Sequence, residues 1–291
     1  MKSLPNLKGP LGRSFDTDPK RMAEKMCRAL NEDEGDQHIG NGYDCRECRN
    51  KGFVFVVVED SYKGNVFYKE KSITCKCMKI RASIRKMKKS GLENIIAKCT
   101  FDKYNATDDW QKLIKSKAQT FAQEVDNLED KWFYLGGAVG GGKTHLCTAI
   151  VRDQLYKGKE ARYMLWDEDS KPLKASANDE RRYAELIEPL KTVEVLYIDD
   201  FLKTAKKDKH SDEYYDPTPA DLKLAYEIIN HRYFVPGLIT VISSERYITE
   251  IIDMDPAVGS RIYEKTKENA NACNVTRLEE RNYRTRDMQT I

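Results

Sequence analysis

The sequence predicts an α/β fold in which helices flank a parallel β-sheet, preceded by a small cysteine-containing domain. From Lys131 onward, apolar runs of strand character alternate with helical patterns, which is typical of a parallel sheet covered by helices. A glycine-rich segment separates the first of these strands from the next helix. Two cysteine pairs enclose a β-rich segment nearer the N-terminus. Together these observations predict two domains of different character.

Composition excludes several classes of protein. The 291 residues are enough for one or two domains with a core. No apolar run approaches the ~20 residues that span a bilayer, and the first residues lack the apolar stretch of a secretory signal, so we expect a cytoplasmic protein without membrane contact. In that compartment, the eight cysteines favour metal binding or burial over disulfides. The net charge of +3 restricts any nucleic-acid contact to a local surface.

The N-terminal elements follow from spacing and turn residues. Pro19 to Leu30 has the apolar spacing of a helix. The β-rich segment Phe53 to Thr74 is expected to form a hairpin around Lys63-Gly64-Asn65. A basic helix is expected from about Lys79 to Lys89. We place the domain boundary near Thr100, which gives domains 1–99 and 100–291.

The second domain begins with a long helical pattern from Asp108 to Leu128. Four strands are then expected, with helical patterns between them. They are Trp132 to Leu135, Arg162 to Trp166, Val193 to Ile198 and Leu238 to Ser243. Each strand should therefore run in the same direction as its neighbours, with the helices on the two faces.

The glycine-rich segment is a P-loop. It reads Gly137-Ala138-Val139-Gly140-Gly141-Gly142-Lys143-Thr144 and stands between a strand and the helix from His145 to Tyr156. Glycines let backbone amides converge on phosphate oxygens at a helix N-terminus, the lysine supplies charge to the outer phosphates, and the threonine hydroxyl is a ligand for Mg²⁺. We expect ATP to be bound by Gly137, Gly140, Gly141, Gly142, Lys143, Thr144 and His145.

Two carboxylates provide the second half of the phosphate site. The apolar run from Val193 to Ile198 ends in Asp199 and Asp200, and open α/β sheets bind ligands at this end of their strands. Asp199 is expected to hold Mg²⁺, and Asp200 to orient or deprotonate the attacking water. An apolar run ending in two aspartates is weak evidence alone, but together with the P-loop it predicts ATP hydrolysis.

Two further groups are candidates for the same chemistry. The strand from Leu238 ends in Ser243-Ser244-Glu245, which would place a polar side chain between the two phosphate motifs if this strand lies beside both. The alternative is a cap for the helix that begins near Tyr247. Arg261 lies too far along the chain to belong to a loop of its own phosphate site. It is a candidate for contact with the nucleotide of a neighbouring subunit, where an arginine accelerates phosphoryl transfer, and the alternative for a single arginine is a surface ion pair.

Four cysteines form two pairs with metal-ligand spacing. They are Cys45 and Cys48, then Cys75 and Cys77. Four thiolates suit tetrahedral Zn²⁺, although the second pair has a one-residue spacer, which is tighter than usual. We expect a structural, zinc-ribbon-like site, with His38 a less favoured ligand. The scattered Cys27, Cys99, Cys147 and Cys273 are expected to be buried small hydrophobes.

These motifs resemble those of the bacterial and phage replicative-helicase loaders typified by DnaC and DnaI, within the AAA+ ATPases. The resemblance covers most of the chain. Besides the phosphate motifs, the matching stretches are Cys75-Lys76-Cys77, Thr100-Phe101-Asp102-Lys103-Tyr104, Glu227-Ile228-Ile229-Asn230-His231-Arg232-Tyr233, Gly259-Ser260-Arg261-Ile262 and Asn282-Tyr283-Arg284. The resemblance implies an AAA+ core and makes Arg261 the arginine finger.

The chain departs from this family at two points. Many relatives carry a sensor asparagine where this sequence has Glu245, which leaves the sensor role with Ser244 or with Glu245 itself. The sequence ends soon after Arg284, so we expect no full helical lid.

The resemblance implies an ATP-dependent loader that binds ATP, Mg²⁺ and single-stranded DNA, assembles with itself in the presence of ATP, and delivers a hexameric replicative helicase through the zinc domain. Basic residues after Asp200 are either a solvated surface or a contact for single-stranded DNA. They are Lys203, Lys206, Lys207, Lys209 and His210. The alternatives are a transposition-helper ATPase of the same superfamily and an ATP-binding module that has lost hydrolysis.

Overall fold

The computed structural model describes residues 18–38, 43–88, 96, 98–205, 215–278 and 282. The chain divides into two compact units, residues 1–81 and 82–291. The predicted roles of Lys206, Lys207, Lys209, His210, Tyr283 and Arg284 fall outside the described residues. The functional boundary near Thr100 stays a prediction.

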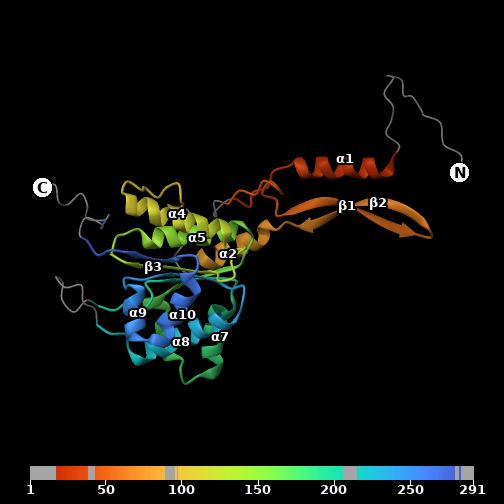
Figure 1. Ribbon diagram of the computed structural model, residues 1–291. Helices are drawn as coiled ribbons and strands as arrows, with labels where there is room; N and C mark the ends of the chain where they lie inside the picture. Colours follow the sequence, from red (N-terminus) through yellow and green to blue (C-terminus); the bar gives the residue numbers. More distant parts are fainter. Residues whose placement is uncertain are drawn as a thin grey trace, which may run out of the picture. The chain divides into compact units, whose positions relative to one another are not determined.

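The first unit is a helix packed on a hairpin (Figure 1). Helix α1 (Pro19–Glu32) lies against strands β1 (Phe53–Tyr62) and β2 (Asn65–Thr74), which pair antiparallel. Lys63 and Gly64 form the turn with left-handed φ angles of 49° and 79°, so the predicted hairpin is confirmed. Helix α2 (Cys77–Lys88) follows β2.

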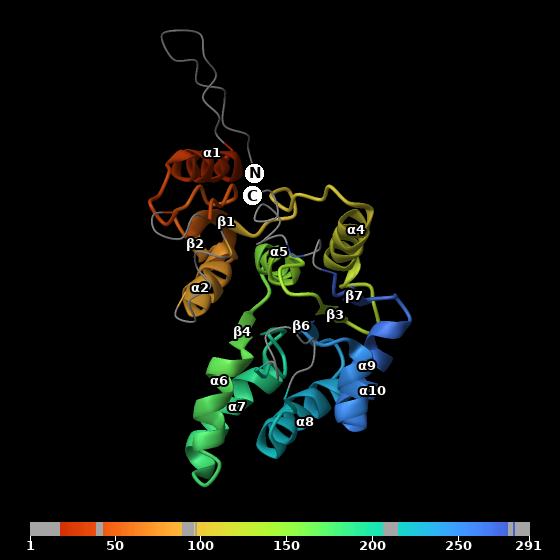
Figure 2. The same cartoon turned by 90° about the vertical axis from the view of Figure 1, so that its left-hand side faces the viewer.

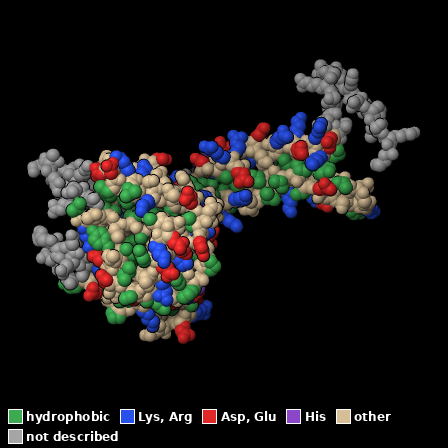
Figure 3. Space-filling model, viewed as in Figure 1, with side chains coloured by type: hydrophobic (Ala, Val, Ile, Leu, Met, Phe, Trp, Pro, Cys, Tyr) green, Lys and Arg blue, Asp and Glu red, His purple; other side chains and the backbone are tan. Residues whose placement is uncertain are grey.

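Part of the hairpin surface is apolar. Large hydrophobic side chains of β1 and β2 are exposed, and they appear in green along the strands in Figure 3. The most exposed are Tyr62 and Val66, near the hairpin turn. Helix α1 packs on the two-stranded sheet. This packing stabilises the hairpin, which alone would be only marginally stable in water.

The second unit contains a five-stranded parallel sheet with the order β4-β5-β6-β3-β7. The strands are β3 (Trp132–Gly137), β4 (Ala161–Leu165), β5 (Val195–Asp199), β6 (Ile239–Ser243) and β7 (Ala272–Val275). The predicted α/β class is confirmed, and so are four of its strands. Strand β7, a four-residue edge strand beside β3, was not predicted from the sequence.

Helices cover both faces of this sheet (Figures 1 and 2). Their bounds are α4 (Asp109–Glu124), α5 (Lys143–Tyr156), α6 (Trp166–Ala175), α7 (Glu180–Thr192), α8 (Pro219–Phe234), α9 (Ile248–Met254) and α10 (Pro256–Lys267). Helices α4 and α5 share one buried cluster with the sheet, and α6 to α10 share another. None of the helices in the described part of the chain is long and apolar enough to cross a bilayer.

Successive side chains of a strand point to opposite faces of the sheet and so contribute to both buried clusters. In β3, Phe133 and Leu135 belong to the cluster under α4 and α5, whereas Trp132 and Tyr134 belong to the opposite cluster. All four side chains are buried because both faces of the sheet are covered. Since β6 lies between β5 and β3, the carboxyl ends of these three strands meet at one edge.

Candidate functional site

The P-loop connects β3 to α5 with a backbone that requires glycine. Gly142 is the N-cap of α5 and has a left-handed φ of 78°. A Cβ atom at this position would lie 2.5 Å from a ring carbon of Tyr104. The glycine is therefore needed both for backbone conformation and for close packing beside the helix N-terminus. This N-terminus presents backbone amides of the kind that bind phosphate.

Lys143 opens helix α5 and is 7% exposed. Its Nζ donates hydrogen bonds of 2.9 Å to Gly137 O and 2.7 Å to Ala138 O. Burial holds the pKa of Lys143 below its ordinary value, and the nearby carboxylates of Glu245, Asp200 and Asp199 only partly offset this effect. The ammonium group is thus held inside the P-loop, where a lysine is expected to meet phosphate.

Asp199 accepts hydrogen bonds at the end of β5. Thr144 Oγ1 lies 3.2 Å from Oδ1, and Tyr163 Oη lies 3.0 Å from Oδ2. Ser243 Oγ, at the end of β6, also donates to Oδ1. The Tyr197 hydroxyl lies 3.1 Å from the same Ser243 Oγ. The oxygens of Thr144 and Asp199 fit Mg²⁺, which prefers hard oxygen ligands and retains several waters.

A cluster of three charged side chains borders the Asp199 site. Lys203 Nζ lies 2.8 Å from Asp200 Oδ2 and 3.1 Å from Glu245 Oε1. Asp200 itself has a left-handed φ of 53°, which is uncommon for a residue other than glycine. From the sequence, Lys203 was expected in a basic segment that is either solvated or in contact with single-stranded DNA, so its ion pairs with Asp200 and Glu245 were not predicted.

These residues enclose a pocket of about 390 Å³. It is lined by Cys99, Lys103, Tyr104, Asn105, Gln111, Val139, Gly140, Gly141, Gly142, Lys143, Thr144, His145, Asp200, Lys203 and Glu245. At one side, the rings of Tyr104 and His145 meet edge to face with centroids 5.4 Å apart. His145 Nε2 also lies 2.8 Å from Thr100 O. The pocket therefore combines a phosphate-type loop with aromatic side chains.

The sequence analysis did not assign the pocket residues between Cys99 and Gln111 to the site. The resemblance had marked Thr100 to Tyr104, but only as a matching stretch without a role. The position of this stretch beside the P-loop depends on tertiary packing, since Tyr104 packs in the buried cluster with α4 and α5.

The two sensor candidates differ in position. Glu245 lines the pocket. Ser244 is fully buried, and its Oγ donates a 2.8 Å hydrogen bond to Phe201 O. The alternative role for the Ser243-Ser244-Glu245 segment was a cap for helix α9. The N-cap of α9 is Tyr247, so neither Ser243 nor Ser244 is in that position. Strand β6 lies between β5 and β3, so the condition that this strand lies beside both phosphate motifs is met. The sensor assignment of Ser244 stays a prediction.

Arg261 lies on α10. Its Nη1 donates a 2.7 Å hydrogen bond to Ala257 O, and its guanidinium lies over the rings of Tyr226 and Tyr233 at 5.3 and 5.5 Å. Arg261 is not one of the described residues that line the pocket containing the P-loop. This position agrees with the expectation that it does not serve its own phosphate site, and a role in a neighbouring site stays a prediction.

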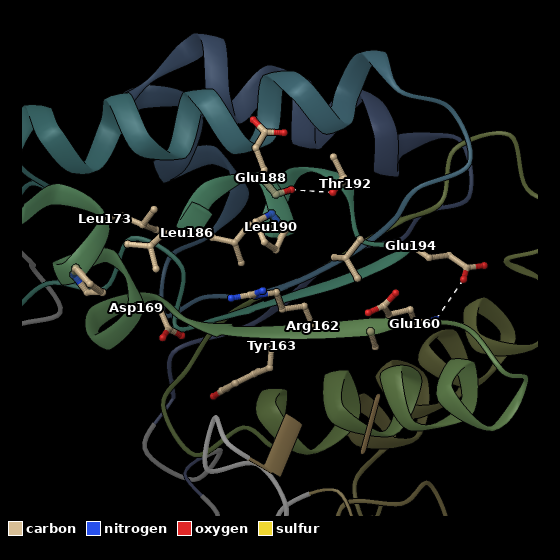
Figure 4. A pocket seen from close by; sticks show the side chains of 14 residues that line it. Glu160, Arg162, Tyr163, Asp169, Leu173, Leu186, Glu188, Leu190, Thr192 and Glu194 are labelled. Atoms are coloured by element: carbon tan, nitrogen blue, oxygen red, sulfur yellow. Dashed lines mark hydrogen bonds between the residues drawn. The ribbon is translucent and has the colours of Figure 1, made fainter. Parts of the chain in front are cut away.

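A larger hollow of about 940 Å³ lies along strand β4 (Figure 4). It is bordered by α6 and α7 and carries the side chains of Arg162, Glu188 and Leu190. Tyr163 also lines it, and its hydroxyl reaches Asp199. None of the described residues that line this hollow belongs to the P-loop.

The cysteine cluster forms in the first unit. Cys45, Cys48, Cys75 and Cys77 are buried, and their Sγ atoms lie within 4.8 Å of one another. Gly52 N donates to Cys48 Sγ at 3.3 Å, as backbone amides do around metal-bound thiolates. The set of four close thiols fits tetrahedral zinc. His38 is exposed and is not part of the cluster.

The remaining cysteines are mostly buried, as expected. Cys27, Cys147 and Cys273 are buried, and burial raises the pKa of each thiol. The expectation was wrong for Cys99, which is partly exposed and lines the nucleotide pocket. Nearby residues such as Phe101 and Tyr104 pack in the core, while Cys99 itself lies at the pocket that contains the P-loop.

Comparisons with known proteins point to replication ATPases. The family model of the bacterial DnaA ATPase domain matches residues 96–264, more than half of the chain. The uncharacterized protein YqaM of Bacillus subtilis (strain 168) is 26% identical over 88% of this chain and 90% of its own length. The replicative helicase loader DnaC of Escherichia coli (strain K12) is 28% identical over 118 residues, which are 40% of this chain and 47% of DnaC. A crystal structure of the DnaC helicase loader superposes with a TM-score of 0.48 at 19% identity, covering 62% of this chain and 97% of that one.

Proposed function

Because the chain belongs to the family of the bacterial DnaA ATPase domain, we propose that it is an ATP-dependent loader of a replicative helicase. The predicted resemblance to DnaC-like loaders is confirmed by the similarity to DnaC. One observation above all supports ATPase activity. The distance between Thr144 Oγ1 of the P-loop and Asp199 Oδ1 of β5 is 3.2 Å, so the two phosphate motifs meet at the same edge of the sheet.

The pocket residues have distinct roles in this proposal. The amides of Gly140 to Lys143 and the Lys143 ammonium bind the phosphates. Thr144 and Asp199 hold Mg²⁺, which when bound neutralises charge on the phosphate oxygens. Asp200 orients the attacking water. Tyr163 and Ser243 fix the Asp199 carboxylate by donating hydrogen bonds to it.

The loader part of the proposal assigns a task to each unit. The cysteine unit, with zinc bound, contacts the hexameric helicase through a surface that includes the exposed apolar side chains of the hairpin. The ATPase unit binds single-stranded DNA and assembles with further copies of itself, and Arg261 completes the site of a neighbour. The similarity to a replicative helicase loader over 118 residues supports the loader role of the chain.

A second candidate is an ATP-binding module with little or no hydrolysis. The 2.8 Å ion pair between Lys203 and Asp200 favours it, because a carboxylate engaged by an ammonium is less able to accept a proton from water. The two candidates differ in turnover but not in nucleotide binding. A change of Asp200→Asn that left the basal rate unaltered would favour the module.

The proposal is tested by titrating the full chain into a hexameric replicative helicase and following the mass of the complex by light scattering, with and without ATP. We expect a defined complex with the hexamer. The Lys143→Ala variant is the control for ATP dependence. If no complex forms in either condition, the loader proposal is wrong and a transposition-helper ATPase becomes the better assignment.

A further inference from the structure

The pocket contains a second lysine at the phosphate motifs. Lys203 follows strand β5 and lines the same pocket as the P-loop residues Lys143 and Thr144. Its Nζ forms ion pairs of 2.8 Å with Asp200 and 3.1 Å with Glu245. Its side chain is 38% exposed, while that of Glu245 is only 13% exposed. Lys203 is therefore a partly exposed lining residue of the pocket, and it is paired with a nearly buried carboxylate.

We propose that Lys203 is a second phosphate-binding residue of this site, which recognises the terminal phosphate of a nucleoside triphosphate, and that Glu245 holds it in position. The inference rests on the proposed function, because it assumes that the P-loop binds a nucleotide. It extends that function by naming the residue that distinguishes a triphosphate from a diphosphate.

The charges around the pocket support this role. An ammonium group carries three donors, and within the described part of the chain two of those of Lys203 meet Asp200 and Glu245. The third is available to a phosphate oxygen without breaking either ion pair. Without Lys203, the carboxylates of Asp200 and Glu245 would repel the terminal phosphate, which is the most highly charged group of the nucleotide.

The backbone that carries Lys203 is fixed by the end of β6. Asp200 and Leu202, on either side of Phe201, both have left-handed φ angles of 53°. Ser244 Oγ donates to Phe201 O at 2.8 Å, and Arg246 Nε donates to Leu202 O at 3.3 Å. Unfavourable backbone conformations persist when surrounding contacts determine them, and they concentrate at functional sites. A lysine on a loop held in this way has a defined position.

The protonation state agrees with the assignment. Burial lowers the pKa of Lys203, but hydrogen bonds and charge from Asp200 and Glu245 outweigh burial and raise the pKa above its ordinary value. The side chain is therefore charged at neutral pH, so it can bind a phosphate oxygen as a cation.

The experiment compares the affinities of ATP and ADP for the full chain by titration with fluorescent nucleotides. In Lys203→Gln, we expect ATP to bind about tenfold more weakly, since one charge-assisted hydrogen bond is lost. ADP should bind within about twofold of the unaltered protein, because it lacks the terminal phosphate. Retained ADP binding also shows that the variant is folded.

The matched control is Lys174→Gln. Lys174 forms a 2.5 Å ion pair with Asp221, and its side chain is 31% exposed, close to the value for Lys203. We expect this variant to bind both nucleotides normally. Equal weakening of ATP and ADP in Lys203→Gln, loss of both, or no change in either would overturn the proposal. If the unaltered chain binds neither nucleotide, the proposed ATPase function itself fails.

Discussion

The hydroxyl of Tyr163, on the edge strand β4, lies 3.0 Å from Oδ2 of Asp199 at the end of β5. Burial and the charge of Asp199 raise the pKa of Tyr163, so the phenol remains a neutral donor. Asp199 Oδ1 lies 3.2 Å from Thr144 Oγ1, on the P-loop side. Tyr163 therefore orients the carboxylate that we expect to hold Mg²⁺.

A change of Tyr163→Phe should weaken the response to Mg²⁺. Loss of a hydrogen bond to a metal-holding carboxylate lowers metal affinity by on the order of tenfold. We expect the Mg²⁺ concentration for half-maximal ATP binding to rise by about that factor. The control is Tyr183→Phe, which removes a comparable 2.6 Å hydrogen bond, to Glu227. An unchanged Mg²⁺ response in Tyr163→Phe would contradict the positioning role.

A change of Lys143→Ala should abolish ATP binding. The ammonium is the charged group of the P-loop, so we expect affinity to fall by on the order of a hundredfold or more, measured by calorimetry. Zinc content should stay the same, because the cysteine cluster lies in the other unit. Lys159→Ala, which removes an ion-pair partner of Asp126 outside the P-loop pocket, should leave ATP binding intact. ATP binding by Lys143→Ala would refute the assignment of the P-loop.

The role of Arg261 can be tested by mixing two inactive variants. Arg261→Ala lacks the arginine but keeps a nucleotide site, and Lys143→Ala lacks the site but keeps the arginine. If Arg261 acts in a neighbouring subunit, a mixture should recover part of the ATPase rate, measured as phosphate release. Recovery should depend on the mixing ratio. No recovery at any ratio would mean that Arg261 does not act between subunits.

Loss of zinc should affect only the first unit. A change of Cys48→Ser, or treatment with a zinc-selective chelator in the presence of Mg²⁺, should release zinc and unfold that unit, because structural zinc contributes roughly 10–16 kcal/mol of apparent binding energy to such sites. Zinc can be measured by a colorimetric chelator and unfolding by circular dichroism. ATP binding should persist. The control is Cys27→Ser, since Cys27 lies outside the cluster, and equal zinc loss in both variants would count against the site.

The N-terminus of α8 predicts a pH dependence. Asp221 accepts hydrogen bonds from Lys174 at 2.5 Å and from Thr218 Oγ1 at 2.6 Å. Burial raises the pKa of Asp221, but these bonds outweigh it and hold the pKa below its ordinary value of 3.8. Its stabilisation is therefore complete above that value and is lost as the pH falls through the lower folded pKa.

We expect Asp221→Asn to lower the free energy of unfolding by about 1–3 kcal/mol at pH 7, through loss of the capping contact and the ion pair. The difference in free energy of unfolding between this variant and the unaltered protein should become smaller toward about pH 3, where the Asp221 carboxylate of the unfolded chain is already protonated. Urea unfolding at both pH values measures it. A difference that does not narrow would contradict the lowered pKa.

Sequence alone located the residues whose role depends on local pattern. The P-loop, the two aspartates after an apolar strand, the hairpin turn at Lys63 and the cysteine pairs are each encoded within short stretches of the chain. Alternating apolar runs also predicted the parallel sheet, since buried strands need apolar side chains on both faces. The short edge strand β7 escaped because four residues carry too little pattern to identify a strand.

Only the tertiary structure decided which distant residues share the site. The order of the strands placed Ser243 and Tyr163 on Asp199, and packing placed Tyr104 over the P-loop. The loop after β5 brought Lys203, which a charge pattern had assigned to a basic segment, between Asp200 and Glu245. A sequence specifies side chains and their local spacing, whereas contacts between strands and loops far apart in the chain are set by the way the elements pack.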